Sequence, residues 1–99
     1  MLYAIIGIDV PDSLARRAAA RPAHVLRLEA LRNEGRLLLA GPFPAIDGTD
    51  PGPAGYTGSL IVAEFADLGA ARAWADADPY VTGGVYASVS VRPFRQTLP

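Results

Sequence analysis

The chain has 99 residues, of which 51% are hydrophobic, and this length and composition predict one folded domain over residues 1–99 rather than a disordered chain. The net charge is −1, without a dense basic patch, which argues against a nucleic-acid partner. The absence of cysteine excludes disulfides, thiolate catalysis and zinc fingers, and it fits a cytoplasmic location.

Residues 2–8 predict the first strand, because they are apolar and rich in strand-forming side chains. Apolar residues fall on both of its faces, with Leu2, Ala4, Ile6 and Ile8 on one and Tyr3 and Ile5 on the other. Such a strand is expected inside a sheet that is covered on both sides. The chain starts without a basic segment and cleavage site, so we expect no signal peptide and no membrane span.

The next stretch predicts helical structure that Pro22 interrupts. Asp12 or Ser13 can cap a first helical segment. Pro22 either kinks one helix or begins a second, since proline is accommodated in a first turn. The interpretation we favour is a helix over residues 22–34, which Gly35 ends from the C′ position.

The only histidine of the chain lies on this helix. His24, Leu28 and Leu31 follow the i, i+4, i+7 spacing of one helical face, which is expected to face the core. Arg21 lies three residues earlier, beside this face, whereas Arg27 falls on a more exposed side. His24 is therefore predicted to point inward, near the N-terminal end of the helix.

Three further strands and one further helix are expected. The strands are predicted at residues 36–43, 58–65 and 85–91, and the helix at residues 68–76 after an Asp67 cap. Gly41-Pro42 and Pro93 are expected to end strand pairing. Residues 44–57 form a long loop rich in proline and glycine, which is either a lid or binding loop or a mobile hairpin connection.

The order β-α-β-β-α-β predicts an α+β, ferredoxin-like fold with both helices on one face of a four-stranded antiparallel sheet. The other face then remains apolar, and its burial is worth roughly 25 cal/mol per Å². A second copy, packed sheet against sheet, is the simplest cover, so we expect a homodimer. Assembly beyond the dimer stays open.

Asp78 precedes a proline, which restrains it to an extended conformation. If the fold brings it to His24, the two form a His–Asp pair suited to moving a proton near neutral pH. Asp78 would then fix the tautomer of the ring and stabilise the imidazolium. The rival interpretations are a core histidine bonded to a backbone carbonyl and a turn aspartate bonded to nearby N–H groups.

Several short motifs together make the chain resemble the YciI-like (YCII-related) family over nearly its whole length. They are the Arg21-x-x-His24 helix segment, Gly41-Pro42, Gly58-Ser59 and Asp78-Pro79-Tyr80 before Gly84. The resemblance implies a dimeric α+β barrel of ferredoxin-like subunits. It also implies a pocket in which His24 and Asp78 form a catalytic pair and Ser59 lies beside them. One branch of the family resembles dehydrochlorinases that act on chlorinated hydroxyquinols.

Four further residues are assigned to substrate binding. Ser59 is expected to hydrogen-bond the substrate or only to fill a strand, and no G-x-S-x-G elbow makes it a nucleophile. Arg21 either holds a substrate anion or is solvated, and Tyr80 either packs or lines the pocket. Gly41 completes the set.

We expect no cofactor. One histidine and no cysteine argue against a soft-metal site, although a carboxylate site for Mg²⁺ or Ca²⁺ stays open. The function we expect is cofactor-free proton transfer, by elimination or isomerisation, on a small anionic or aromatic molecule. The alternative is a binding module for small molecules that has no catalytic activity.

Overall fold

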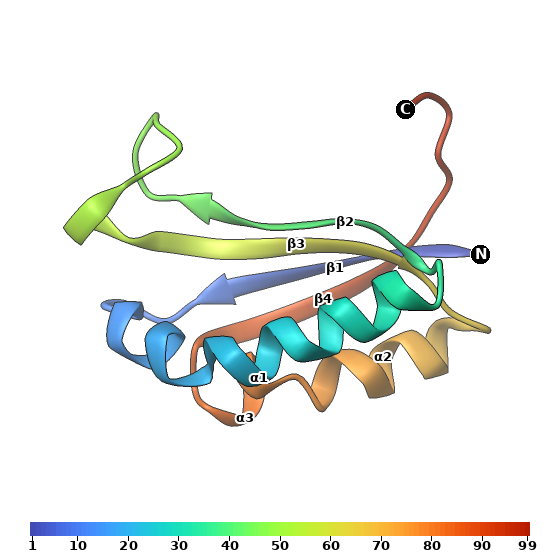
Figure 1. The fold of residues 1–99 in the computed structure, drawn as a ribbon, viewed down its shortest axis with the longest axis horizontal. Helices are drawn as coiled ribbons and strands as arrows, with labels where there is room; N and C mark the ends of the chain where they lie inside the picture. Colours follow the sequence, from blue (N-terminus) through green and yellow to red (C-terminus); the bar gives the residue numbers. More distant parts are fainter.

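The computed structural model describes all residues 1–99 as an α+β ferredoxin-like fold. In chain order the elements are β1 (Leu2–Asp9), α1 (Leu14–Asn33), β2 (Leu37–Pro44), a 3₁₀ turn η1 (Gly52–Ala54), β3 (Tyr56–Glu64), α2 (Leu68–Asp76), α3 (Pro79–Thr82) and β4 (Tyr86–Phe94). The four strands form one antiparallel sheet in the order β2-β3-β1-β4. All three helices lie on the same side of the sheet (Figure 1), so the predicted fold class is confirmed.

The main core lies between the helices and the inner face of the sheet. Ile5 of β1 pairs with Ile61 of β3 on one side and Val91 of β4 on the other, so three branched side chains share the inner face. Leu31 of α1 packs in the same cluster and is 2% exposed. α2 contributes only small buried residues to this cluster, which allows that helix to lie close to the sheet.

α1 is one continuous helix of 20 residues with Pro22 inside it, so the predicted start at Pro22 is wrong. Proline lacks the N–H that would bond to the carbonyl of Ala18. Ala18 is exposed, where water can reach a free carbonyl. A long amphipathic face packed on the sheet outweighs the loss of one bond. No helix of the molecule, this one included, has both the length and the apolar character needed to cross a membrane.

α1 ends at Asn33, which places Gly35 in the C′ position that the sequence predicted. Gly35 has φ +72°, a left-handed conformation that favours glycine. Its N–H donates to the carbonyl of Arg32, and the N–H of Arg36 donates to the carbonyl of Leu31. These two bonds form a Schellman motif, which satisfies carbonyls that the helix end would otherwise leave free.

Two of the expected strand ends are wrong. β2 continues through Gly41 and Pro42 to Pro44, and β4 continues through Pro93 to Phe94. Both strands are sheet edges, where a proline can turn its missing N–H away from the neighbouring strand. The loop between β2 and β3 is shorter than predicted, because β2 ends at Pro44 and β3 already begins at Tyr56, and it contains η1.

No helix lies over the outer face of the sheet (Figure 1). The side chains that β1, β2 and β3 place on this face are mostly apolar, whereas β4 adds Ser88, Ser90 and Arg92. On this face Ala4 pairs with Val62, and Ile6 pairs with Leu60. Large side chains of the same face are solvent-exposed, including Ile8 at 50%, Leu39 at 46% and Phe94 at 39%. The molecule therefore presents a broad apolar surface opposite its helices.

Candidate functional site

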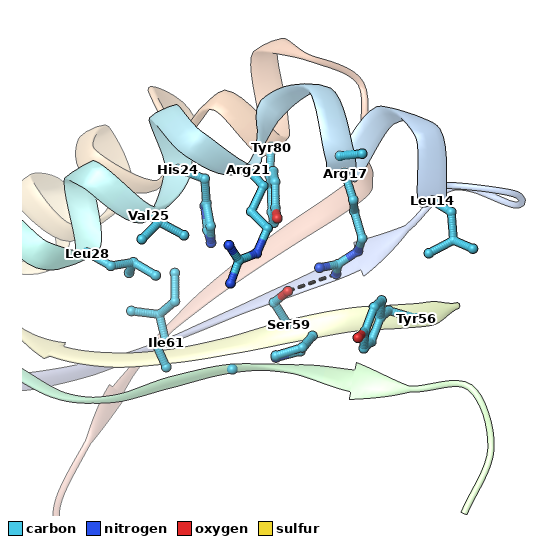
Figure 2. Close-up of a pocket in the computed structure, with 14 residues that line it drawn as sticks. Leu14, Arg17, Arg21, His24, Val25, Leu28, Tyr56, Ser59, Ile61 and Tyr80 are labelled. Atoms are coloured by element: carbon cyan, nitrogen blue, oxygen red, sulfur yellow. Dashed lines mark hydrogen bonds between the residues drawn. The ribbon is translucent and has the colours of Figure 1, made fainter. Parts of the chain in front are cut away.

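A cavity of about 380 Å³ opens between α1 and the inner face of β2 and β3. Figure 2 shows Arg17, Arg21 and His24 extending from α1 toward the strands, and Val25, Leu28 and Ile61 lining an apolar end of the cavity. The residues that matter chemically are Arg17, Arg21 and His24 from α1, Tyr56 and Ser59 from β3, Gly41 from β2 and Tyr80 from α3. A volume of this size suits a small ligand.

His24 and Asp78 meet, as the sequence predicted. Nδ1 of His24 lies 2.8 Å from Oδ1 of Asp78 and 3.0 Å from Oδ2. Both side chains are buried, at 8% and 3% exposure. Nε2 of His24 has no hydrogen bond to the protein, and Figure 2 shows the ring pointing into the cavity. The carboxylate therefore orients the ring from behind, and the free nitrogen is presented to the cavity.

Asp78 takes its position from a short helix that the sequence did not predict. It caps α3, with Pro79 in the first helical position. Its backbone is extended, at φ −61° and ψ 133°, and its Oδ1 accepts from the N–H of Tyr80 at 2.8 Å. Asp78 is therefore extended, as the following proline predicted. It also serves as the N-cap of α3, which the sequence did not predict.

Tyr80 forms a wall of the cavity and supports the His24 ring. The two rings stack with centroids 3.8 Å apart and planes 8° apart. Burial raises the pKa of Tyr80, although the charges of Arg17 and Arg21 oppose this. His24 is thereby fixed in orientation by a hydrogen bond at one edge and by an aromatic ring against its face.

His24 lies in the middle of α1, whereas the sequence predicted a position near a helix N-terminus. The error follows from placing the helix start at Pro22. Because the helix begins eight residues earlier, Arg17 occupies a turn on the same face as Arg21 and His24.

Arg17 is the largest omission from the predicted site. It is buried, and it donates to both carboxylate oxygens of Asp9, at 2.6 and 2.9 Å. Its Nη2 also donates to the carbonyl of Gly58 and to Oγ of Ser59, each at 2.9 Å. Burial would lower the pKa of Arg17, but the hydrogen bonds and charge of Asp9 outweigh it and raise the pKa. Asp9 and Arg17 thus neutralise each other at one end of the cavity.

Arg21 differs from Arg17 because it takes part in no hydrogen bond to a side chain and in no ion pair of the molecule. Figure 2 shows its guanidinium inside the cavity, between His24 and Arg17. Since Arg17 is already paired with Asp9, the unpaired positive charge of the cavity is that of Arg21.

The remaining predicted residues, Ser59 and Gly41, both line the cavity. Oγ of Ser59 accepts from Nη2 of Arg17 at 2.9 Å, so its hydroxyl hydrogen can be donated either to the phenol of Tyr86, whose pKa Ser59 lowers, or to a ligand. A hydroxyl bonded to a guanidinium is a poor nucleophile. Three His, Cys, Asp or Glu side chains that could hold a metal ion do not gather anywhere in the molecule.

Sequence reasoning missed Asp9, Ser13 and Tyr56 as well as Arg17. Ser13 donates to Asp9 at 2.6 Å, and the rings of Tyr56 and Tyr80 flank the Arg17 guanidinium at 5.1 and 5.0 Å. A signal was available, because positions 13, 17, 21, 24, 28 and 31 follow one helical face. Treating Pro22 as a helix start divided this face in two.

Comparisons with known proteins agree with this fold. Residues 1–95 match the YCII-related domain. The chain is 60% identical over 98 residues to Protein YciI of Escherichia coli O6:H1, and 51% identical to a protein of Haemophilus influenzae; each alignment covers 99% of this chain and all of the relative.

One solved structure is similar along almost all of the chain. It is 5-chloro-2-hydroxyhydroquinone dehydrochlorinase, TftG, of Burkholderia phenoliruptrix, in complex with 2,5-dihydroxybenzoquinone. The TM-score is 0.81 and the identity 27%, with 96% of this chain and 94% of that chain covered. On the domain match and the identity to these relatives, the chain belongs to the family of proteins with a YCII-related domain.

Proposed function

We propose that the cavity binds a small planar anion and that His24 transfers a proton to or from it. The observation that carries this proposal is the free Nε2 of a ring fixed by a buried carboxylate, which faces a cavity beside the unpaired guanidinium of Arg21. A positioned base of this kind accelerates proton transfer by about 10²–10⁴.

Each polar group of the cavity has a role in this reaction. Arg21 binds an anionic oxygen of the substrate, and Ser59 donates a hydrogen bond to a second oxygen. The apolar end at Ile61 receives the substrate ring. Nε2 of His24 takes the proton while Asp78 accepts from Nδ1–H and stabilises the imidazolium.

The proposed reaction is an elimination, and an isomerisation would use the same first step. His24 takes a proton, and the electron pair of the broken bond forms a new double bond. The leaving group then departs with its own bonding pair, so no oxidant or cofactor is required. The similarity to TftG supports this chemistry, because a dehydrochlorinase removes a proton and chloride from its substrate.

The first test is binding of 2,5-dihydroxybenzoquinone, the ligand of TftG, measured by calorimetry. We expect Arg21→Met to weaken binding by about tenfold or more, since a charge-assisted hydrogen bond is lost. Arg32→Met is the matched control, because Arg32 is an exposed arginine on the same helix and outside the cavity. Equal affinities of the two variants would contradict the assignment of Arg21.

The second test is chloride release from a chlorinated hydroxyquinol. We expect His24→Gln to lower the rate by about 10²–10⁴ while ligand affinity changes only a few-fold. Tight binding without turnover by the unmodified protein would instead favour the binding module.

We also propose that two chains pair through the outer face of the sheet. Exposed apolar side chains of three strands lie on this face, among them Ile8, Leu39 and Phe94. Burying them in a two-fold interface would be favourable by roughly 25 cal/mol per Å².

Sedimentation of Leu39→Lys tests the pairing, because a lysine there would place a charge in the interface. We expect this variant to shift the protein from dimer to monomer. Leu26→Lys is the control, since Leu26 is 66% exposed on the helical side of the molecule. A monomeric unmodified protein would rule the interface out.

A further inference from the structure

A second positive side chain lies behind the His24–Asp78 pair, on the side away from the cavity. Arg27 is one helical turn after His24, and only 24% of its side chain is exposed. The sequence predicted a more exposed position for it than for His24, and its side chain is indeed more exposed than the 8% of His24. Its guanidinium lies over the Trp74 ring, 4.1 Å from the centroid, and Nη2 donates to the carbonyl of Trp74 at 2.7 Å.

The geometry toward Asp78 is unusual. Nη1 of Arg27 lies 4.0 Å from Oδ2 of Asp78, too far for a hydrogen bond, yet this Nη1 is buried and has no other partner. Leaving a charged donor without a partner is costly. The carbonyl of Trp74 in the last turn of α2 already anchors the guanidinium, so helix packing does not require Nη1 to face the carboxylate.

We propose that Arg27 is a positioning residue that sets the charge state of the His24–Asp78 pair. Its positive charge keeps Asp78 ionised and opposes a second positive charge on His24. The resting ring is then neutral, with Nδ1–H on Asp78 and a free lone pair on Nε2, which is the state a general base requires. This inference rests on the proposed function, because only proton transfer gives that state a purpose.

The other charged or titratable groups near the pair come from four elements. α1 contributes Arg17 and Arg21, β1 contributes Asp9, α3 contributes Tyr80, and β4 contributes Tyr86. Burial raises the pKa of Tyr80 and raises that of Tyr86 to about 12, so both phenols stay neutral while an imidazole titrates. Arg17 is balanced by Asp9. Arg21 remains, and it is unchanged in the variants below.

The test is an NMR titration of the imidazole, which is unambiguous because the chain has one histidine. Arg27→Gln removes the charge and keeps a donor for the Trp74 carbonyl, and Arg27→Met is a second neutral variant. We expect both to raise the pH midpoint of the titration by about half a unit or more, since a like charge has been removed. Arg27→Lys keeps the charge, and we expect its midpoint to stay near that of the unmodified protein.

A purely structural Arg27 would give another pattern. All three variants would then lower the free energy of unfolding without moving the midpoint, or Arg27→Lys would move it as much as Arg27→Gln; either result overturns the inference. The titration needs no substrate, so its outcome is separate from that of the proposed function. If the protein showed no turnover but Arg27→Gln and Arg27→Met raised the pH midpoint of the His24 titration, the enzymatic function would be rejected and the effect of Arg27 on the pair would be supported.

Discussion

Two carboxylates are buried equally deeply in this molecule but have different partners. Asp9 and Asp78 have side-chain exposures of 2% and 3%. Asp9 is held by a bidentate guanidinium, that of Arg17, and by a hydroxyl. Asp78 is held by an imidazole and one backbone N–H, with a second guanidinium at 4.0 Å that does not bond to it.

The difference separates a structural ion pair from one that can move a proton. A guanidinium stays protonated at any physiological pH, so the Asp9 pair has one state. An imidazole changes its charge near neutral pH, so the Asp78 pair has two. The cavity lies between a fixed end, at Arg17 and Ser59, and a switchable end, at His24.

Breaking the pair of Asp9 and Arg17 is expected to cause the largest loss in the free energy of unfolding. Asp9→Ala leaves Arg17 buried without its counter-ion, and removal of one partner from such a pair costs about 3–5 kcal/mol. Urea unfolding measures the loss. The double variant Asp9→Ala with Arg17→Met should recover part of it, because the uncompensated charge is gone.

An exposed ion pair provides the control for this experiment. Arg72 and Asp76 are 3.1 Å apart, but both side chains are about half exposed. Asp76→Ala is expected to cost no more than about 0.5 kcal/mol. If Asp9→Ala lowered the free energy of unfolding as little as Asp76→Ala does, the pairing of Asp9 with Arg17 would not stabilise the fold.

Replacing Asp78 is expected to lower the free energy of unfolding less than replacing Asp9 does, and to change the titration of the His24 ring directly. Asp78→Asn can still cap α3 through its amide oxygen, so we expect a loss of about 1–3 kcal/mol. Oδ1 of Asp78 both accepts from the N–H of Tyr80 and lies 2.8 Å from Nδ1 of His24, so an amide oxygen there can still accept from Nδ1–H but no longer carries the charge that stabilises the imidazolium. An NMR titration of the single histidine measures this loss, and we expect a lower pH midpoint in Asp78→Asn. An unchanged midpoint would show that the carboxylate charge does not act on the ring.

The sequence was sufficient to predict the order of the four strands and the two longer helices and the fold class, and with the family resemblance it also predicted the meeting of His24 with Asp78; it did not predict α3. Hydrophobic spacing and the Asp-Pro restraint act locally, and both are visible in the chain. The strand ends at Pro42 and Pro93 could not be predicted in the same way, because a proline is tolerated in a strand only once that strand is an edge.

The fixed end of the site was missed for a related reason. Arg17 is one of three arginines close together in the chain, with Arg16 and Arg21, and nothing local pairs it with Asp9, eight residues earlier and across a turn. The chain has 10 acidic residues and nine arginines, which offer many pairings, and only the packing of α1 on β1 and β3 selects this one. The contact between Gly7 and Tyr86 could not be predicted either, because only the fold shows that the missing side chain of Gly7 leaves room for the ring of Tyr86.

Tyr86 supplies the smallest predicted effect at neutral pH. A Cβ on Gly7 would lie 2.5 Å from its ring, so the phenol lies directly over β1. Burial raises its pKa to about 12; Ser59 and Arg17 oppose the increase, and the charges of Asp78 and Asp9 add to it. The folded protein therefore keeps the phenol proton at a pH where the unfolded chain, with a pKa near 10, has lost it.

The sign of the pH dependence follows from that difference. Below pH 10 the phenol contributes no pH dependence, and between pH 10 and 12 stability falls as pH rises, by up to about 1.4 kcal/mol per pH unit. Tyr86→Phe removes this contribution, so we expect its unfolding free energy to fall less steeply in alkaline urea titrations, with Tyr80 supplying the remainder. Parallel alkaline profiles for the two proteins would mean that the phenol is ionised equally easily in both states.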